Sequence, residues 1–237
     1  MSAGDGLENK AQAEGVESAQ SAQMQAVKTL YPNEVSEAFS RYSGLPVELI
    51  SDAYTADAAH ITKRLKAKVI GQDAACLAAS EILARFKAGL NDPERPCGSL
   101  LFVGPTGVGK TELAKQVAAY MFGSPERMIR LDMSEYMGYG SAQRLLTPSR
   151  GQSLVERMRQ QPLSLVLLDE IEKAHPEVFD LLLGVLGEGR LTDTEGQLAD
   201  FRMGLIILTS NLGVQEGPPP SFHGMAVGQG GDERFTR

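Results

Sequence analysis

The stretch Gly104-Pro105-Thr106-Gly107-Val108-Gly109-Lys110-Thr111 decides how this chain folds. It has the pattern G-x-x-x-x-G-K-[ST], and it lies between an apolar run at residues 100–103 and a helical pattern at residues 112–120. A strand, a glycine-rich turn and a helix in this order are the context in which the pattern marks a phosphate-binding loop. Glycines let the backbone turn tightly and direct its N–H groups toward an anion, and the helix start adds its positive dipole end. The sequence therefore predicts that these residues bind the phosphates of a nucleotide.

Two side chains of this loop have specific expected roles. Lys110 would contact the β- and γ-phosphates of ATP, and the hydroxyl of Thr111 would bind Mg²⁺. The alternative is a glycine loop that matches the pattern by chance. The flanking strand and helix argue against that alternative, because a chance match needs no such context.

Four apolar runs predict the strands of the fold, at residues 100–103, 128–131, 163–168 and 203–209. Helical patterns lie between them, and the longest begins near Asp73. The 237 residues, 42% of them hydrophobic and 22% charged, fit one large globular domain. Since strands alternate with helices, we expect an α/β fold with a parallel sheet sandwiched between helices.

Composition divides the chain into three expected regions. Residues 1–32 contain few large apolar groups, so we expect a disordered or helical linker there. Residues 33–213 would form the nucleotide-binding core. Residues 214–237 include three consecutive prolines and a glycine-rich run, which favours a flexible tail.

Three finer predictions concern local structure. Asn33 is a plausible N-cap of a first helix that ends at Gly44, with apolar residues along one face. Residues 137–151 are rich in glycine and serine, so an exposed loop is expected. A helix should begin at Pro176, with these side chains inward: Val178, Phe179, Leu182, Leu183 and Leu186.

Charge and cysteine content exclude several classes of protein. A net charge of −7 argues against broad electrostatic attraction to nucleic acid. Cys76 and Cys97 lack metal-ligand spacing and are expected to be reduced and structural. No run approaches 18 apolar residues, and no signal peptide follows Met1. We therefore expect a cytoplasmic location, with neither nucleic acid nor a membrane as partner.

Polar residues follow two of the predicted strands. Asp169 and Glu170 come directly after residues 163–168, at a carboxyl end of the sheet where ligands gather. One carboxylate could hold Mg²⁺ and the other could orient the attacking water, although a solvated strand end is the plain alternative. Asn211 follows residues 203–209, where its amide could contact the γ-phosphate or simply form a turn. His175, beside Pro176, has no metal partner in the sequence and is expected to be a structural or surface histidine.

These stretches together resemble the second ATPase module of the ClpA/ClpB group of AAA+ unfoldases, and the similarity spans most of the chain. The most specific matches are Val69-Ile70-Gly71-Gln72-Asp73 and residues 104–115, 168–176, 189–193, 200–202 and 209–213. Ser43-Gly44-Leu45-Pro46-Val47 also resembles the start of that module.

The resemblance implies a P-loop NTPase fold of the AAA+ type and a role for each matching residue. The catalytic residues would be Glu170, Lys110 and Asn211. Glu170 would activate the attacking water, and Asn211 would be the polar sensor. Thr111 and Asp169 would organise Mg²⁺. The adenine would be cradled by Leu45, Pro46, Val47, Val69, Ile70 and Gly71. The implied work is ATP-driven remodelling of client proteins by a homo- or hetero-oligomeric ring, a hexamer by resemblance.

The sequence departs from the family at two places. The family's pore loop carries an aromatic residue between glycines, whereas residues 144–151 are short and contain none, and Tyr136 and Tyr139 upstream are expected at the surface. The trans-acting arginine, the helical lid and its sensor arginine have no match, since Arg190 and Arg202 correspond to other positions. We therefore expect a slow ATPase in isolation that does not thread polypeptide. A regulatory or assembly module, or a fragment, that hydrolyses little ATP is the alternative.

Overall fold

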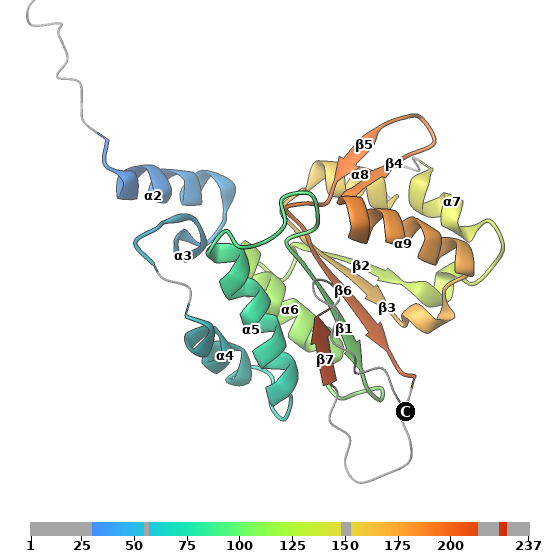
Figure 1. Cartoon of the computed structure of the whole chain (residues 1–237), viewed down its shortest axis with the longest axis horizontal. Helices are drawn as coiled ribbons and strands as arrows, with labels where there is room; N and C mark the ends of the chain where they lie inside the picture. Colours follow the sequence, from blue (N-terminus) through green and yellow to red (C-terminus); the bar gives the residue numbers. More distant parts are fainter. Residues whose placement is uncertain (1–29, 55–56, 148–152, 213–222, 227–237) are drawn as a thin grey trace, which may run out of the picture.

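The computed structural model of the chain describes residues 30–54, 57–147, 153–212 and 223–226. At its centre is a five-stranded sheet in the order β2-β3-β6-β1-β7. Its strands are β1 (Gly98–Val103), β2 (Met128–Asp132), β3 (Leu165–Asp169), β6 (Leu205–Ser210) and β7 (His223–Ala226). The first four strands of this order are parallel, and helices lie on both sides of the sheet (Figure 1). The predicted α/β fold, with a parallel sheet between helices, is confirmed.

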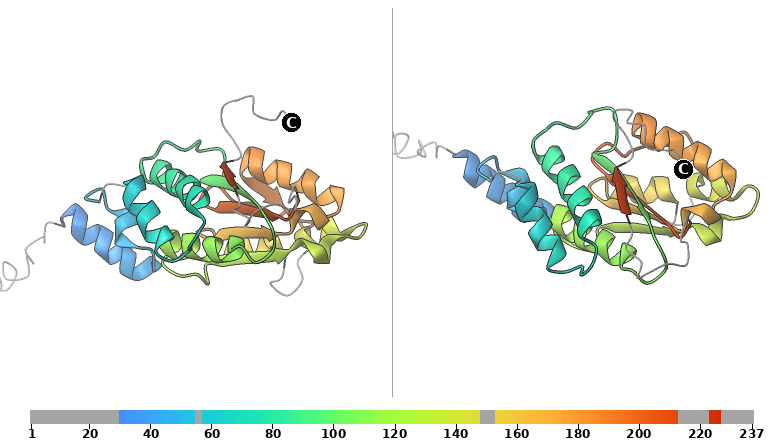
Figure 2. Two further views of the ribbon diagram at one scale, coloured as in Figure 1. Left: turned by 90° about the horizontal axis from the view of Figure 1, so that it is seen from below. Right: turned by 60° about the horizontal axis from the view of Figure 1, so that its bottom comes forward.

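Within the described ranges, six helices cover the two faces of the sheet. One face carries α4 (Ala58–Lys66), α5 (Asp73–Lys87) and α6 (Lys110–Phe122), and the other carries α7 (Ser141–Leu146), α8 (Leu154–Gln160) and α9 (Pro176–Glu188). Helices α2 (Pro32–Ser43) and α3 (Val47–Ile50) lie at one end of the molecule, away from the sheet (Figure 2). Short 3-10 turns, η1 (Met133–Tyr136) and η2 (Ile171–Lys173), follow β2 and β3, and β4 (Arg190–Thr192) pairs with β5 (Leu198–Asp200) in a separate hairpin. No helix of the described segments is long and apolar enough to cross a membrane.

Alternate residues of the central strands contribute to two hydrophobic cores on opposite faces. Leu165 and Leu167 of β3 pack with α5 and α6, whereas Val166 and Leu168 pack with α8 and α9. Successive side chains of a strand point to opposite faces, so covering both faces buries every residue of β3 and β6. This explains why these two strands are apolar almost throughout rather than alternating.

Helix α2 differs from its prediction at its start. Tyr31 is the N-cap and Pro32 is the first helical residue, so the prediction of Asn33 as N-cap is wrong. Proline is favoured at this position because its φ suits a helix and the first turn needs no N–H. The helix ends at Gly44 with φ of 72°, as predicted. No residue of α2 is buried, so its apolar face does not contact either core.

The predicted exposed loop at residues 137–151 contains a helix instead. Helix α7 follows Gly140, and its residue Leu145 is buried against α8 and α9. Tyr136 is also buried, beneath the Arg144 guanidinium, so its predicted surface position is wrong, whereas Tyr139 is 91% exposed as expected. The short stretch at residues 148–151, part of the unmatched pore loop, lies outside the described residues.

Helix α9 begins at Pro176 as predicted, but fewer of its apolar side chains are buried than the sequence pattern predicted. Val178 and Leu182 are buried, whereas Phe179 is 42% and Leu183 is 68% exposed, so their inward assignment is wrong. The helix lies at the surface and packs along one line of residues spaced by about one turn. His175 caps it, because its Nδ1 accepts a hydrogen bond from the Glu177 N–H at 3.4 Å, which confirms a structural role.

Strand β7 corrects the prediction for the tail. Its four residues pair antiparallel with β1, whereas the sequence favoured a loop there. The pairing satisfies backbone groups of β1 that would otherwise form an open edge of the sheet. Residues 1–29, 213–222 and 227–237 lie outside the described part, and the division into three regions stays a prediction.

Both cysteines are free and buried. They belong to the hydrophobic core that α5 and β1 share. Burial raises the pKa of each thiol, most strongly for Cys97, which also donates to the Gly204 carbonyl oxygen. A thiol that resists ionisation is a poor nucleophile and metal ligand, so the structural assignment of both residues is supported.

Candidate nucleotide site

The phosphate loop joins the end of β1 to the start of α6. The N–H of Gly104 donates to the Ser210 carbonyl oxygen at 3.0 Å, which fixes the start of the loop to the end of β6. Gly107 and Gly109 have φ of 84° and 98°, a conformation that side chains rarely adopt. A Cβ atom on Gly107 would meet nothing within 4 Å, so glycine is required there by conformation and not by crowding.

Lys110 is held at the mouth of this loop. Its ammonium donates to the carbonyl oxygens of Gly104 at 2.6 Å and Pro105 at 2.7 Å, and to Oδ1 of Asn211 at 2.8 Å. Burial lowers the pKa of Lys110, and the nearby carboxylates of Asp169, Glu172 and Glu170 oppose that shift. A charge that is desolvated and already surrounded by acceptors interacts strongly with a phosphate oxygen that replaces one of them.

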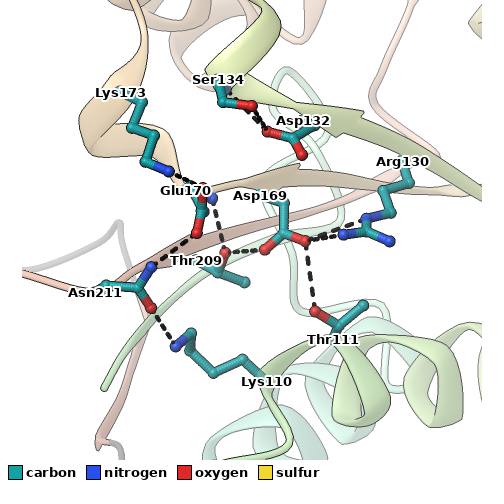
Figure 3. A network of polar contacts seen from close by, with 10 residues as sticks. All are labelled: Lys110, Thr111, Arg130, Asp132, Ser134, Asp169, Glu170, Lys173, Thr209 and Asn211. Atoms are coloured by element: carbon teal, nitrogen blue, oxygen red, sulfur yellow. Dashed lines mark hydrogen bonds and ion pairs between the residues drawn. The ribbon is translucent and has the colours of Figure 1, made fainter. Parts of the chain in front are cut away.

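Asp169 is the last residue of β3, and its side chain is only 11% exposed. Its Oδ1 accepts from the Thr209 hydroxyl at 2.5 Å, and its Oδ2 accepts from the Arg130 guanidinium. The Thr111 hydroxyl is 3.5 Å from the same Oδ2 (Figure 3). The structure therefore brings together the two residues that the sequence assigned to Mg²⁺.

Glu170 is the only residue other than glycine with positive φ among the described residues, at φ 57° and ψ 51°. A left-handed conformation here costs about 1–3 kcal/mol and persists because surrounding contacts hold it. The backbone N–H of Glu170 donates to the Thr209 hydroxyl at 3.1 Å. Its Oε1 accepts from Nδ2 of Asn211 at 3.1 Å, and its Oε2 pairs with Lys173 (Figure 3). The hydrogen bond to Glu170 raises the pKa of Lys173.

Asn211 links the phosphate loop to the acidic pair. Its side chain accepts from Lys110 and donates to Glu170, and its backbone N–H donates to Oε1 of Glu172 at 3.0 Å. A cavity of about 370 Å³ is lined by the phosphate loop together with Asp169, Glu170 and Asn211. All three residues thus share one cavity with the loop, as their positions after β3 and β6 led us to expect.

The sequence analysis assigned no role in this network to Thr209 or Arg130. Thr209 is fully buried, and its single hydroxyl accepts from Glu170 and donates to Asp169. A hydroxyl in an otherwise apolar strand is a signal that could have identified it. Arg130 lies on β2, and its contact depends on the pairing of β2 with β3, which the sequence does not specify.

The residues expected around the adenine fall into two groups. Val69 lies beside the phosphate loop, since its Cγ1 is 3.7 Å from the position that a Cβ on Gly109 would occupy. The Gln72 side chain donates to the Val108 carbonyl oxygen at 2.8 Å, which holds this segment there. Ile70 is 90% exposed and Gly71 has φ of 78°. An adenine contact from Val69, Ile70 and Gly71 stays a prediction.

The second group, Leu45, Pro46 and Val47, lies farther along the fold from the phosphate loop, and an adenine contact from these residues also stays a prediction. The preceding Gly44 and Pro46 pack against Gly123, the C-cap of α6. A helix of 13 residues places that cap about 20 Å from Lys110. None of the three residues lines the cavity at the loop.

Arg190 and Arg202 do not approach the nucleotide site. Each donates to Oε2 of Glu94, at 3.0 and 2.9 Å. Glu94 precedes the amino end of β1, whereas the phosphate loop follows its carboxyl end, so this cluster lies at the opposite end of the strand from the loop. Neither arginine is placed to contact a phosphate bound in the same chain.

The donors at the site fit Mg²⁺, which prefers oxygen ligands and few protein groups beside substrate phosphates. Thr111 and Asp169 offer a hydroxyl and a carboxylate oxygen. The described residues contain no cluster of three or more His, Cys, Asp or Glu side chains that could hold a metal by themselves. A metal here would therefore depend on the phosphates for its remaining ligands.

Comparisons with known proteins agree with this architecture. The family described as AAA domain (Cdc48 subfamily) matches residues 95–220. The chain is 48% identical over 191 residues to the negative regulator of genetic competence ClpC/MecB of Bacillus subtilis, which covers 78% of this chain and 24% of that protein. It is 46% identical over 189 residues to the chaperone protein ClpB of Lactococcus lactis subsp. cremoris (77% and 22%), and 45% identical over 203 residues to ClpB of Meiothermus ruber (83% and 23%).

The chain thus spans less than a quarter of the length of these relatives. The matched region contains the phosphate loop, both acidic residues and Asn211, which are the residues that carry the resemblance. This chain belongs to the AAA+ ATPases, as a module of the Clp type.

Proposed function

We propose that this chain binds Mg·ATP and hydrolyses it, as the nucleotide-binding core of a Clp-type ring that remodels proteins. The observation that carries the proposal is a single polar network around one cavity, built from Lys110, Thr111, Asp169, Glu170 and Asn211. Each member has a type of side chain that phosphoryl transfer to water uses.

In this proposal the loop N–H groups and Lys110 hold the phosphates. Thr111 and Asp169 would hold Mg²⁺, which would neutralise part of the charge of the phosphates. The Lys110 ammonium exchanges its contacts with the Gly104 and Pro105 carbonyl oxygens for phosphate oxygens. Because the lysine is already buried and positioned, little ordering accompanies this exchange.

Glu170 is the proposed base that orients the attacking water and accepts its proton. Asn211 contacts Glu170 and Lys110 at once, so it is placed to position the γ-phosphate relative to that water. The single hydroxyl oxygen of Thr209 accepts a hydrogen bond from the backbone N–H of Glu170 and donates one to the carboxylate of Asp169. The metal ligand and the base are therefore kept at a fixed separation.

A second candidate is a regulatory or assembly module that binds nucleotide but hydrolyses little. It is favoured by the pairing of both carboxylate oxygens of Glu170, one with Asn211 and one with Lys173. Each contact uses acceptor capacity of the carboxylate and stabilises its charged form, so a base held in both contacts accepts a proton from water less readily. The ring, its client proteins and the cytoplasmic location are proposals that follow from the resemblance to Clp proteins.

One preparation separates the candidates. Mg·ATP affinity is measured by calorimetry and turnover by phosphate release, with Lys110→Ala as the control for nonspecific binding and contaminating ATPase. Binding with turnover that Lys110→Ala lacks supports the first candidate, and binding without turnover supports the second. An unchanged affinity in Lys110→Ala would overturn the site itself.

A further inference from the structure

We propose that Arg130 is a built-in cation that competes with Mg²⁺ for the carboxylate of Asp169. This inference rests on the proposed binding of Mg·ATP. It adds a residue to the site whose expected effect is on the metal dependence of nucleotide binding. The argument comes from the contacts of one carboxylate oxygen.

Two donors of Arg130 reach the same oxygen. Nε lies 3.1 Å and Nη2 lies 2.6 Å from Oδ2 of Asp169. This is also the oxygen nearest the hydroxyl of Thr111, the other expected metal ligand (Figure 3). The second oxygen, Oδ1, is engaged by Thr209. Arg130 therefore holds the only oxygen of Asp169 that faces Thr111.

A metal and this guanidinium cannot both keep full contact with that oxygen. Mg²⁺ takes its ligands at about 2.0–2.1 Å in near-octahedral geometry, often with water between it and a carboxylate. Either arrangement needs space and negative charge that Nε and Nη2 of Arg130 now use. Two cations on one oxygen also repel each other in a partly desolvated site. Metal binding should therefore displace Arg130 at least in part.

The guanidinium of Arg130 is partly in solvent, whereas the carboxylate of Asp169 is almost fully enclosed. The side chain of Arg130 is 52% exposed and that of Asp169 is 11% exposed. Arg130 lines the nucleotide cavity and also a neighbouring cavity of about 860 Å³, whose walls include two acidic residues, Asp132 and Glu135, and two further arginines, Arg144 and Arg157. When the guanidinium leaves Asp169, it has room there, and Asp132, which already interacts with Arg130, is the carboxylate nearby.

The contact has a second consequence when no metal is present. Asp169 and Glu170 both line the cavity that is to receive polyanionic phosphates. Arg130 neutralises Asp169 and so reduces its repulsion of a metal-free nucleotide. Removing Arg130 should therefore weaken binding without Mg²⁺ but lower the Mg²⁺ concentration needed for tight binding. These opposite effects distinguish competition from general damage to the site. General damage would weaken nucleotide binding both without Mg²⁺ and with it.

A salt bridge that only positions Asp169 would have the opposite effect on the Mg²⁺ concentration needed for tight binding. If Arg130 merely oriented Asp169 for the metal, its loss would raise the Mg²⁺ concentration needed. The sign of the change in metal dependence therefore decides between the two roles.

The test titrates a fluorescent ADP analogue into Arg130→Gln and the parent chain, at Mg²⁺ concentrations from zero, set with a chelator, to saturation. We expect the Mg²⁺ midpoint to fall about three- to tenfold and metal-free affinity to fall at least about threefold, the range for a partly exposed, two-donor ion pair. Arg130→Lys keeps the charge but loses the two-donor contact, so it should shift the midpoint in the same direction by less. Thermal unfolding checks that each variant is folded.

Arg144→Gln is the matched control. It removes the same charge from the wall of the same neighbouring cavity, but Arg144 lies over the Tyr136 ring. It should leave the midpoint unchanged. A raised or unchanged midpoint in both Arg130 variants would overturn the inference while nucleotide binding stands. Absence of nucleotide binding by the parent chain at every Mg²⁺ concentration would overturn the proposed function and this inference with it.

Discussion

Replacing Thr209 with valine tests how much of the site depends on one buried hydroxyl. Valine has nearly the same shape but cannot accept from the Glu170 N–H or donate to Asp169 Oδ1, which the threonine does at 3.1 and 2.5 Å. A buried group left without its partner costs about 1–3 kcal/mol, and more when the group is charged. Two such groups give an expected loss of about 2–6 kcal/mol in the free energy of unfolding.

Urea unfolding at constant m-value measures this loss. With m of about 2–3 kcal/mol/M, the urea midpoint should fall by about 1–2 M. Thr209→Ser keeps the hydroxyl and should recover most of the difference, whereas Thr192→Val on exposed β4 should change the midpoint little. If Thr209→Val is as stable as the parent chain, the hydroxyl does not hold the two acidic residues in the way argued above.

Three further predictions concern the nucleotide. Lys110→Ala should nearly abolish ATP binding in calorimetry while circular dichroism shows an intact fold, because a buried charge on the phosphates is lost. Glu170→Gln should still bind Mg·ATP through Asp169 and Thr111 but lose turnover, since an amide cannot accept the proton from water; turnover equal to the parent would place the base elsewhere. The parent chain alone should turn over ATP about 10³–10⁵-fold more slowly than a site with an arginine finger, and should not unfold a fluorescent reporter with ATP. Brisk hydrolysis would mean that another group replaces the finger.

The sequence was sufficient for the elements whose signal is long or chemically distinctive. The apolar runs of β3 and β6 predicted buried strands, and the phosphate loop, Asp169, Glu170 and Asn211 were located by their places between or after strands. Helix α7 was missed because it has only six residues, too few for a helical period to be visible beside Gly138 and Gly140.

Other features depend on partners distant in sequence. The contact between Arg130 and Asp169 requires that β2 and β3 pair in register, with Asp132 opposite Asp169. The apolar stripe of α9 is wider than its contact with the core, so pattern alone assigned Phe179 inward when it is exposed. In both cases the missing information is the packing of one element on another.

The division of β3 and β6 between two cores has a consequence for which insertions and deletions the gene can tolerate. Adding or deleting one residue within either strand would turn the side chains beyond that point to the opposite face of the sheet. The packing of both cores would then be disrupted at once. A change of length between two elements leaves the phase of every strand untouched and changes stability far less. The site at the ends of the strands therefore depends on the exact length of β3 and β6, and much less on the length of the segments that join the elements.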